Sequence, residues 1–316
     1  MRIAILGATS QIARDVILTF SRKNAFDLAL FGRCPVAIDQ WLSTVGLSDR
    51  HVSADFASFN INEYFDAIIN FVGSGNPAQT AMMGESIFDA TLKFDELALK
   101  YLHQHPQCRY IFLSSGAAYG SSFDKPADQN TRAIVPINHL QPQDWYAVAK
   151  LYAECRHRAL PHLHIIDTRI FNYFSHTQDI AARFFITDII RAIQSGETLL
   201  SSPDNIVRDY LGPADFHQLI ERILAAPPTN DVVDCYTLQP VDKLTLLAKM
   251  QERFGLNYEI RNSPAGVNAT GAKMNYFSVN KRAAQFGYMP STSSLEGVLA
   301  EVGLIQGTSS TVSIRV

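Results

Sequence analysis

The first half of the chain alternates short apolar runs with longer segments whose apolar residues recur at helical spacing. In one of these segments the apolar positions are Ile12, Val16, Ile17 and Phe20, which is the spacing of one face of a helix. The short runs are apolar at nearly every position, which is typical of strands buried on both faces of a parallel sheet. The pattern predicts strands at residues 3–6, 28–31, 51–54, 67–72, 110–113 and 163–167, and helices at 12–20, 36–45, 85–103 and 145–160.

Strands that alternate with helices, joined by right-handed crossovers, predict an α/β fold with a doubly wound parallel Rossmann sheet. The regular alternation of predicted strands and helices ends after residue 170. We expect a dinucleotide-binding Rossmann domain over residues 1–170, with parts of 195–225 returning to it, and a smaller C-terminal α+β substrate-binding lobe over most of 171–316. The pattern in this lobe predicts helices at 180–193, 214–224, 242–254 and 295–302, a strand at 198–200 and a loop at 262–272.

Composition narrows the possible functions. Among 316 residues, 47% are hydrophobic and 18% charged, which suits a well-filled core, and a net charge of −3 argues against a broad basic surface for nucleic acid. Four scattered cysteines without a C-x-x-C motif predict neither a metal site nor a redox pair, and favour a reducing cytoplasm. No signal peptide and no membrane-spanning stretch are expected, so we predict a cytoplasmic protein with no membrane partner.

The turn after the first strand, Gly7 to Ala13, is a candidate phosphate-binding turn. Backbone N–H groups between a strand and a helix bind a pyrophosphate. Only Gly7 remains of a three-glycine pattern, since Ser10 and Ala13 hold the other positions, and we hypothesise that the Ser10 hydroxyl donates to the phosphate. The alternative is an ordinary strand-to-helix turn. The predicted cofactor contacts here are Gly7, Thr9, Ser10, Gln11 and Ile12.

The end of the second strand indicates which cofactor binds. An acidic residue at this position holds the ribose of NAD, whereas an arginine accommodates the 2′-phosphate of NADP. The chain has Gly32 at the acidic position and Arg33 after it, which favours NADP, with NAD and a solvated Arg33 as the alternative. Asp55, after the third strand, is predicted to contact the adenine amino group, or else to be a turn residue.

Tyr146 and Lys150 are the candidate catalytic pair. Four residues apart on one helix, they share a face, and an ammonium beside a phenol favours the phenolate, which suits proton transfer near neutral pH. The spacing alone carries little weight in a chain with 12 tyrosines. Its context adds weight, because the strand before this helix ends in Ser114 and Ser115, where ligands bind in parallel sheets.

These motifs, with the segments 112–120, 145–150, 168–172 and 207–210, resemble the extended short-chain dehydrogenase/reductase family of nucleotide-sugar epimerases and dehydratases. The resemblance covers most of residues 1–220 and implies a role for each matching residue. It implies that Ser115 holds the reacting oxygen, that Tyr146 is the acid/base and that Lys150 supports it and binds the ribose. It further implies that Asn172 and Arg208 contact the substrate, Arg208 at the diphosphate; a salt bridge between Arg208 and Asp209 is the alternative.

The chain departs from the family pattern at several positions. Gly116 and Ala117 stand where dehydratases carry an acidic pair, and Asp89 stands where an asparagine is common. Phe71, Val72 and Gly73 are expected beside the cofactor, where the family commonly has other residues.

The expected function is reduction of a keto-sugar nucleotide by an NADP-dependent oxidoreductase. An NAD-dependent epimerase is the alternative, and a non-catalytic dinucleotide sensor is a third hypothesis. The family also suggests a homodimer formed through the helices at 85–103 and 145–160.

Overall fold

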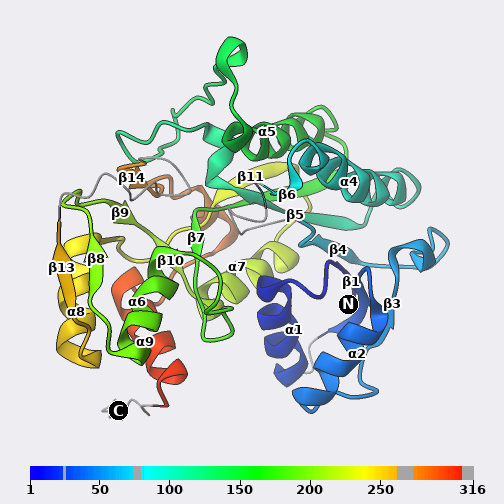
Figure 1. Cartoon of the computed structure of the whole chain (residues 1–316). Coiled ribbons are helices and arrows are strands. Elements are labelled where there is room, and N and C mark those ends of the chain that lie inside the picture. Colours follow the sequence, from blue (N-terminus) through cyan, green and yellow to red (C-terminus); the bar gives the residue numbers. More distant parts are fainter. Residues whose placement is uncertain (24–25, 74–79, 81, 262–272, 308–316) are drawn as a thin grey trace.

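The computed structural model describes residues 1–23, 26–73, 80, 82–261 and 273–307, and Figure 1 shows their arrangement. Its centre is a seven-stranded parallel sheet, which confirms the predicted doubly wound fold. The strand order is β11-β6-β5-β4-β1-β2-β3, with β1 (Arg2–Leu6), β2 (Asp27–Phe31), β3 (Val52–Ala54), β4 (Ala67–Asn70), β5 (Arg109–Ser115), β6 (His164–Ile170) and β11 (Asp231–Asp234).

Helices cover both faces of this sheet (Figure 1). On one face, Ile3 and Ile5 share a core with α1 (Gln11–Lys23), α2 (Pro35–Thr44) and α7 (Pro213–Ala225). On the other face, Ala4 and Leu6 share a core with α4 (Ser86–Gln104) and α5 (Trp145–Arg158). These strand residues are fully buried, which is why the apolar runs showed no alternation with polar residues.

A smaller lobe forms beside the sheet from the second half of the chain (Figure 1). Its core lies between α6 (Phe185–Ser195), α8 (Lys243–Phe254) and α9 (Ser294–Ile305). Short strands pair as β10-β7, β12-β9-β14 and β13-β8. Their bounds are β7 (Asn172–Tyr173), β8 (Leu199–Ser201), β9 (Val207–Arg208), β10 (Tyr210–Leu211), β12 (Val241–Asp242), β13 (Tyr258–Ile260) and β14 (Asn275–Tyr276).

Five single-turn 3-10 helices complete the described elements: η1 (Phe56–Ser58), η2 (Gly116–Tyr119), η3 (Ile137–His139), η4 (Pro142–Asp144) and η5 (Arg282–Phe286). None of the helices in the described residues has the length and apolar character needed to cross a membrane.

Several elements differ from the sequence prediction. The short strands β7, β9, β10, β12, β13 and β14 were not predicted. The edge strand β11 was not predicted, because acidic residues at both of its ends obscure a short apolar run. Helix α6 begins at Phe185, five residues after the predicted start. The preceding turn is held by Arg191, which donates to the carbonyl oxygens of Ile180 and Ala182. The predicted loop at 262–272 lies outside the described residues.

Candidate active site

The strand order brings several of the predicted site residues to one edge of the central sheet. Strands β1, β4 and β5 are neighbours and parallel, so their carboxyl ends lie together. Gly7 follows β1, Gly73 lies just beyond β4, and Ser115 ends β5. The carboxyl edge of a doubly wound sheet is where such folds bind ligands.

The turn after β1 requires glycine at its first position. Gly7 has a φ of +83°, and a Cβ added to it would lie 2.9 Å from the backbone nitrogen of Val72. Its N–H donates to the Phe31 carbonyl at 2.8 Å. The Ser10 Oγ accepts from the Ala13 N–H at 3.3 Å and so caps α1. The hydroxyl proton of Ser10 is not used in this bond, so it remains available to a phosphate at the helix N-terminus.

The neighbouring turn residues Thr9, Gln11 and Ile12 make different contacts. The Gln11 Nε2 donates to the Ser175 hydroxyl at 2.9 Å, so this side chain already joins α1 to the segment after β7. Ile12 is partly buried against the core under α1. The Thr9 methyl group would lie 3.7 Å from a Cβ added to Gly32, which places Thr9 beside the end of β2.

The end of β2 leaves little room for an acidic side chain. A Cβ added to Gly32 would lie 3.0 Å from the end of the Ile38 side chain, so an acidic residue there would require Ile38 to move. Arg33 is exposed and forms no hydrogen bond or ion pair with the described residues. Asp55 accepts from the backbone N–H and the hydroxyl of Ser58, at 2.8 and 2.7 Å, and these hydrogen bonds lower its pKa.

The residues after β4 approach the site mainly through their backbone. The Phe71 side chain is 2% exposed and packs in the core, with its ring centroid 6.5 Å from that of Phe216. Val72 donates its N–H to the Asn70 side chain at 2.9 Å. A Cβ on Gly73 would lie 3.5 Å from the Lys150 Nζ, so the chain after β4 runs directly beside this lysine.

The three predicted catalytic residues come together. The Ser115 Oγ accepts from the Ala117 N–H at 3.1 Å, and its side chain is close enough to the Tyr146 hydroxyl to act on the pKa of that group. Lys150 is 3% exposed, and its Nζ lies 5.8 Å from the Tyr146 ring centroid. The same Nζ donates to the Leu113 carbonyl at 2.7 Å, which fixes the lysine against β5.

Burial shifts the pKa of both members of the Tyr146–Lys150 pair. Burial raises the pKa of Tyr146, and the hydrogen bond from Ser115 only partly opposes it. Lys150 is not among the groups that shift this pKa, so the lowering of the Tyr146 pKa by Lys150 stays a prediction. Burial lowers the pKa of Lys150 to about 8, while the carboxylates of Glu154, Asp95 and Asp167 act to raise it. Lys150 consequently remains mostly charged at neutral pH.

The predicted substrate residues lie on short strands of the smaller lobe. Arg208 is 8% exposed, and its Nη1 donates to the carbonyls of Val207 and Lys273, at 2.8 and 2.7 Å. The Asp209 carboxylate instead accepts from Thr237 and Ser294. The alternative of an Arg208–Asp209 salt bridge is therefore wrong.

Asn172 borders the same region of the site. Its Nδ2 donates to the backbone oxygens of Asp209 and Tyr276, at 3.3 and 3.5 Å. The side chain therefore ties β7 to the two segments that supply Arg208 and Tyr276.

Sequence reasoning missed two residues that border the site, Lys273 and Tyr276. The Tyr276 hydroxyl lies 3.3 Å from the Ser115 Oγ, and its ring centroid lies 5.2 Å from that of Phe171. Tyr276 is 161 residues from Ser115 in sequence and reaches the site because β14 pairs with β9. No motif marks either residue, so only the fold identifies them.

At the position where dehydratases carry an acidic residue, the Phe171 ring occupies the space that an acidic side chain would need. A Cβ added to Gly116 would lie 2.4 Å from ring carbons of Phe171, so an acidic side chain would require that ring to move. Ala117, at the second position of the pair, is 6% exposed. The site therefore offers no acidic group here for the elimination of water.

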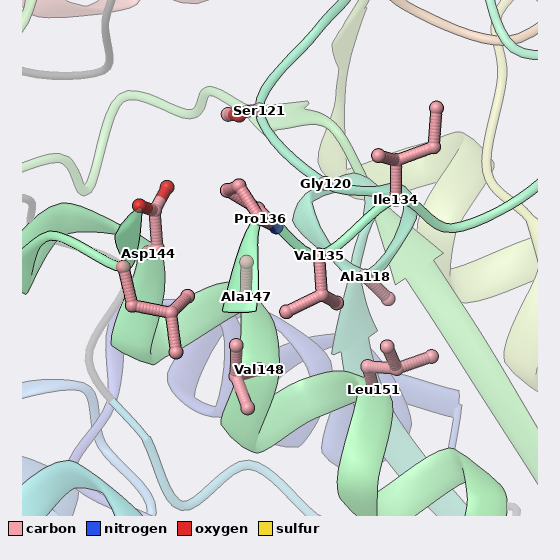
Figure 2. A pocket seen from close by; sticks show the side chains of 11 residues that line it. Ala118, Gly120, Ser121, Ile134, Val135, Pro136, Asp144, Ala147, Val148 and Leu151 are labelled. Atoms are coloured by element: carbon pink, nitrogen blue, oxygen red, sulfur yellow. The ribbon is translucent and has the colours of Figure 1, made fainter. Parts of the chain in front are cut away.

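A small pocket lies beside α5 (Figure 2). Ala147, Val148 and Leu151 line it, whereas the spacing of Tyr146 and Lys150 directs them to a different side of the helix. Within the described residues, no group of three or more His, Cys, Asp or Glu side chains is arranged to hold a metal ion.

Comparison with known sequences identifies one family. The model of the NAD dependent epimerase/dehydratase family matches residues 3–236. Comparison with curated proteins gives no match.

Solved structures share the fold over nearly the whole chain. The dTDP-glucose 4,6-dehydratase from Bacillus anthracis, in complex with NAD, has a TM-score of 0.78 and 14% identity over 97% of both chains. The UDP-glucose 4-epimerase from Thermotoga maritima, with UDP-glucose, has a TM-score of 0.76 and 16% identity over 98% of this chain and 99% of that one. The UDP-glucuronic acid 4-epimerase from Bacillus cereus, with NAD, has a TM-score of 0.74 and 16% identity over 97% and 99%.

Proposed function

The chain belongs to the NAD dependent epimerase/dehydratase family, and is thus an enzyme of the short-chain dehydrogenase/reductase type; from this we propose that it interconverts a hydroxyl and a keto group on a sugar nucleotide. The observation that carries the proposal is the convergence of Ser115, Tyr146 and Lys150 at the carboxyl edge of the sheet. We assign residues 1–170 to cofactor binding and most of 171–316 to substrate binding.

The residues present fit a dinucleotide cofactor. Gly7, where a Cβ would lie 2.9 Å from the Val72 nitrogen, allows a tight turn at the N-terminus of α1, where a pyrophosphate binds. Gly73 leaves similar space beside Lys150. When bound there, nicotinamide supplies or accepts the hydride.

The protein's own groups handle the proton and the oxygen. Tyr146 donates a proton to the substrate oxygen during reduction, or removes it during oxidation. Ser115 holds the same oxygen by a hydrogen bond, and a buried donor is effective because the surroundings exclude water. Lys150 holds the ribose hydroxyls and stabilises the phenolate when Tyr146 has given up its proton. Because burial raises the pKa of Tyr146, the phenolate that forms after proton donation is readily protonated again, which restores the phenol for the next turnover.

Tyr276 completes the hydrogen bonds of Ser115. A serine hydroxyl accepts two hydrogen bonds and donates one. The Ala117 N–H occupies one acceptor position, and the Tyr276 hydroxyl, at 3.3 Å, is placed to donate to the other. Ser115 then has one proton left, which it directs at Tyr146 or at the substrate oxygen.

Reduction of a keto sugar with NADP is the first candidate reaction, because Gly32 lacks room for an acidic side chain and Arg33 is exposed beside it. Epimerisation with NAD is the second candidate, supported by the family name and by neighbours that bind NAD and UDP-sugars. Dehydration is disfavoured by the closed position at Gly116. A non-catalytic sensor role is disfavoured by retention of all three catalytic groups.

The first test identifies the cofactor. The purified protein is denatured and any released nucleotide identified, and melting temperatures are then measured with added NADPH and NADH. Stabilisation by NADPH alone supports the reductase, whereas retained NAD without an NADPH preference supports the epimerase.

A second test addresses catalysis directly. Wild type and the Tyr146→Phe variant are assayed for conversion of UDP-glucose with NAD, and for consumption of NADPH with a UDP-4-keto sugar. We expect the variant to bind cofactor normally and to lose most of its turnover. Undiminished turnover in Tyr146→Phe would refute the proposed acid/base.

A further inference from the structure

A row of three buried polar side chains, Asn70, Tyr110 and Asp95, connects helix α4 to the turn that follows β4. The Asn70 Oδ1 accepts from the Val72 N–H at 2.9 Å. The Asn70 Nδ2 donates to the Tyr110 hydroxyl oxygen at 2.9 Å, and that hydroxyl donates to the Asp95 Oδ1 at 3.1 Å. Asn70 is 1% exposed and the other two side chains are 0% exposed, so these hydrogen bonds are shielded from water.

The hydrogen bonds of this row can run in only one direction. A backbone N–H only donates, so the Val72 N–H requires the amide oxygen of Asn70 to face it. The amide nitrogen of Asn70 then faces the Tyr110 oxygen, which leaves the Tyr110 proton for Asp95. Burial and the charge of Asp95 raise the pKa of Tyr110 well above its usual value, which keeps this proton on the phenol.

The far end of the row is held by two basic residues of α5. The Asp95 Oδ1 also accepts from the His157 Nε2 at 2.7 Å, and its Oδ2 accepts from the Arg156 Nη1 at 3.0 Å. Because both residues donate to Asp95, its carboxylate is the acceptor at which the row ends. The amide of Asn70 is therefore held in one orientation by groups that lie on α4, α5 and β5.

The near end of the row lies at the cofactor side of the candidate site. The Val72 nitrogen, which Asn70 binds through its N–H, would lie 2.9 Å from a Cβ added to Gly7. Gly73 follows directly, and a Cβ added there would lie 3.5 Å from the Lys150 Nζ. A displacement of Val72 would therefore move the chain beside both the phosphate-binding turn and the catalytic lysine.

We propose that Asn70 is a positioning residue of the cofactor site, and that Tyr110 and Asp95 hold its side chain in the orientation that fixes the Val72–Gly73 turn. This inference rests on the proposed function, because the turn borders the space assigned there to nicotinamide. Tyr110 lies in the core between the sheet and α4, and it acts on the site through Asn70. Removal of the Tyr110 hydroxyl leaves the amide nitrogen buried without this acceptor, so the amide orientation is no longer fixed.

The test separates the position of the turn from the stability of the fold. Tyr110→Phe removes the hydroxyl and keeps the ring. Tyr101→Phe is the matched control, because Tyr101 is fully buried in the same core and its hydroxyl also makes two hydrogen bonds. It accepts from the Phe65 N–H at 2.7 Å and donates to the Glu63 carbonyl at 2.8 Å. Both partners precede β4, at the end of the strand opposite the site.

Calorimetry on the full chain measures the binding of NADPH and NADH, and of 2′-phospho-ADP-ribose and ADP-ribose as matching probes without nicotinamide. We expect Tyr110→Phe to weaken the binding of the preferred dinucleotide roughly threefold to tenfold, the effect of one hydrogen bond. The matching probe should lose less affinity, because the Gly7 turn is fixed separately by its hydrogen bond to the Phe31 carbonyl. Tyr101→Phe should bind the dinucleotide like wild type, although both variants should unfold at a lower urea concentration than wild type.

A double variant tests whether Tyr110 acts through Asn70. Asn70→Ala removes the acceptor of the Val72 N–H and should weaken dinucleotide binding roughly tenfold. Adding Tyr110→Phe to Asn70→Ala should cause no further loss of affinity. A further loss as large as that of Tyr110→Phe alone would overturn the inference.

The remaining outcomes separate this inference from the proposed function. Wild-type dinucleotide affinity in Tyr110→Phe would overturn the inference and leave the proposed function standing. Equal losses for the dinucleotide and its matching probe, or an equal loss in Tyr101→Phe, would indicate a general effect on the fold and would also overturn it. If wild type bound neither NADPH nor NADH, the proposed function and this inference would both be refuted.

Discussion

His157 provides a prediction about stability that needs no substrate. It lies on α5 behind Lys150, and its two ring nitrogens each face a carboxylate: Nδ1 is 2.6 Å from Asp167, and Nε2 is 2.7 Å from Asp95. All three side chains are fully buried. A neutral imidazole donates from only one nitrogen, so only the charged form satisfies both contacts.

The size of the effect follows from the shift in pKa. Burial lowers the pKa of His157, but Asp167 and Asp95 raise it more, so that it reaches about 9 from a usual 6.5. Each unit corresponds to 1.36 kcal/mol, so this group contributes about 3 kcal/mol to the free energy of unfolding. Because the folded pKa is the higher one, the contribution is complete below about pH 6.5 and is lost as the pH rises through about 9.

Urea unfolding of wild type and His157→Gln at pH 6, 8 and 10 measures this contribution. We expect the variant to be less stable at pH 6, and the difference between the two proteins to shrink by about 3 kcal/mol by pH 10. His164→Gln is the control. Burial lowers the pKa of His164, so this residue contributes no stability that would be lost at alkaline pH. A difference between wild type and His157→Gln that stays constant from pH 6 to pH 10 would show that His157 is not charged in the folded protein.

Three further predictions concern the active site. Arg33→Ser should reduce the rise in melting temperature caused by NADPH and leave that caused by NADH unchanged; equal shifts in both proteins would remove Arg33 from the cofactor site. Gly116→Asp should lower the melting temperature, because its Cβ would lie 2.4 Å from the Phe171 ring, and should produce no dehydrated sugar on product analysis. Tyr276→Phe should lower turnover by roughly threefold to tenfold, which corresponds to the loss of one hydrogen bond. In a Ser115→Ala background the same substitution should have no effect on turnover, and additive losses would contradict the action of Tyr276 through Ser115.

The sheet was predictable wherever the strand was buried on both faces. β1 and β5 are apolar runs with this burial, and the sequence placed both of them. β11 was not predicted because Asp231 and Asp234 flank its apolar pair, and the arginines that pair with these carboxylates lie far away in the sequence. Asp231 pairs with Arg282, and Asp234 with Arg169, at 2.9 and 3.5 Å. Such long-range pairing is not visible in a local pattern.

The site residues, like the strands, were predictable only where a local pattern marks them. Tyr146 and Lys150 share one helix, and Ser115 ends the strand before it, so local spacing identified all three. Tyr276 and Lys273 reach the site through the pairing of β14 with β9, in which Tyr276 lies opposite Arg208. Only two residues form that strand, which is too short for any periodicity to predict its partner.

The charge on Lys150 depends on carboxylates that are themselves neutralised by other residues. Glu154, one helical turn after Lys150, is bonded by Arg169 at 2.5 Å and accepts from Ser114. The Asp95 and Asp167 carboxylates are shared between His157 and two arginines. All three carboxylates act to raise the pKa of Lys150, yet none forms a salt bridge with it. The lysine therefore stays charged without being held by an acid, and its ammonium group remains on the side of α5 that faces Tyr146 and the turn at Gly73.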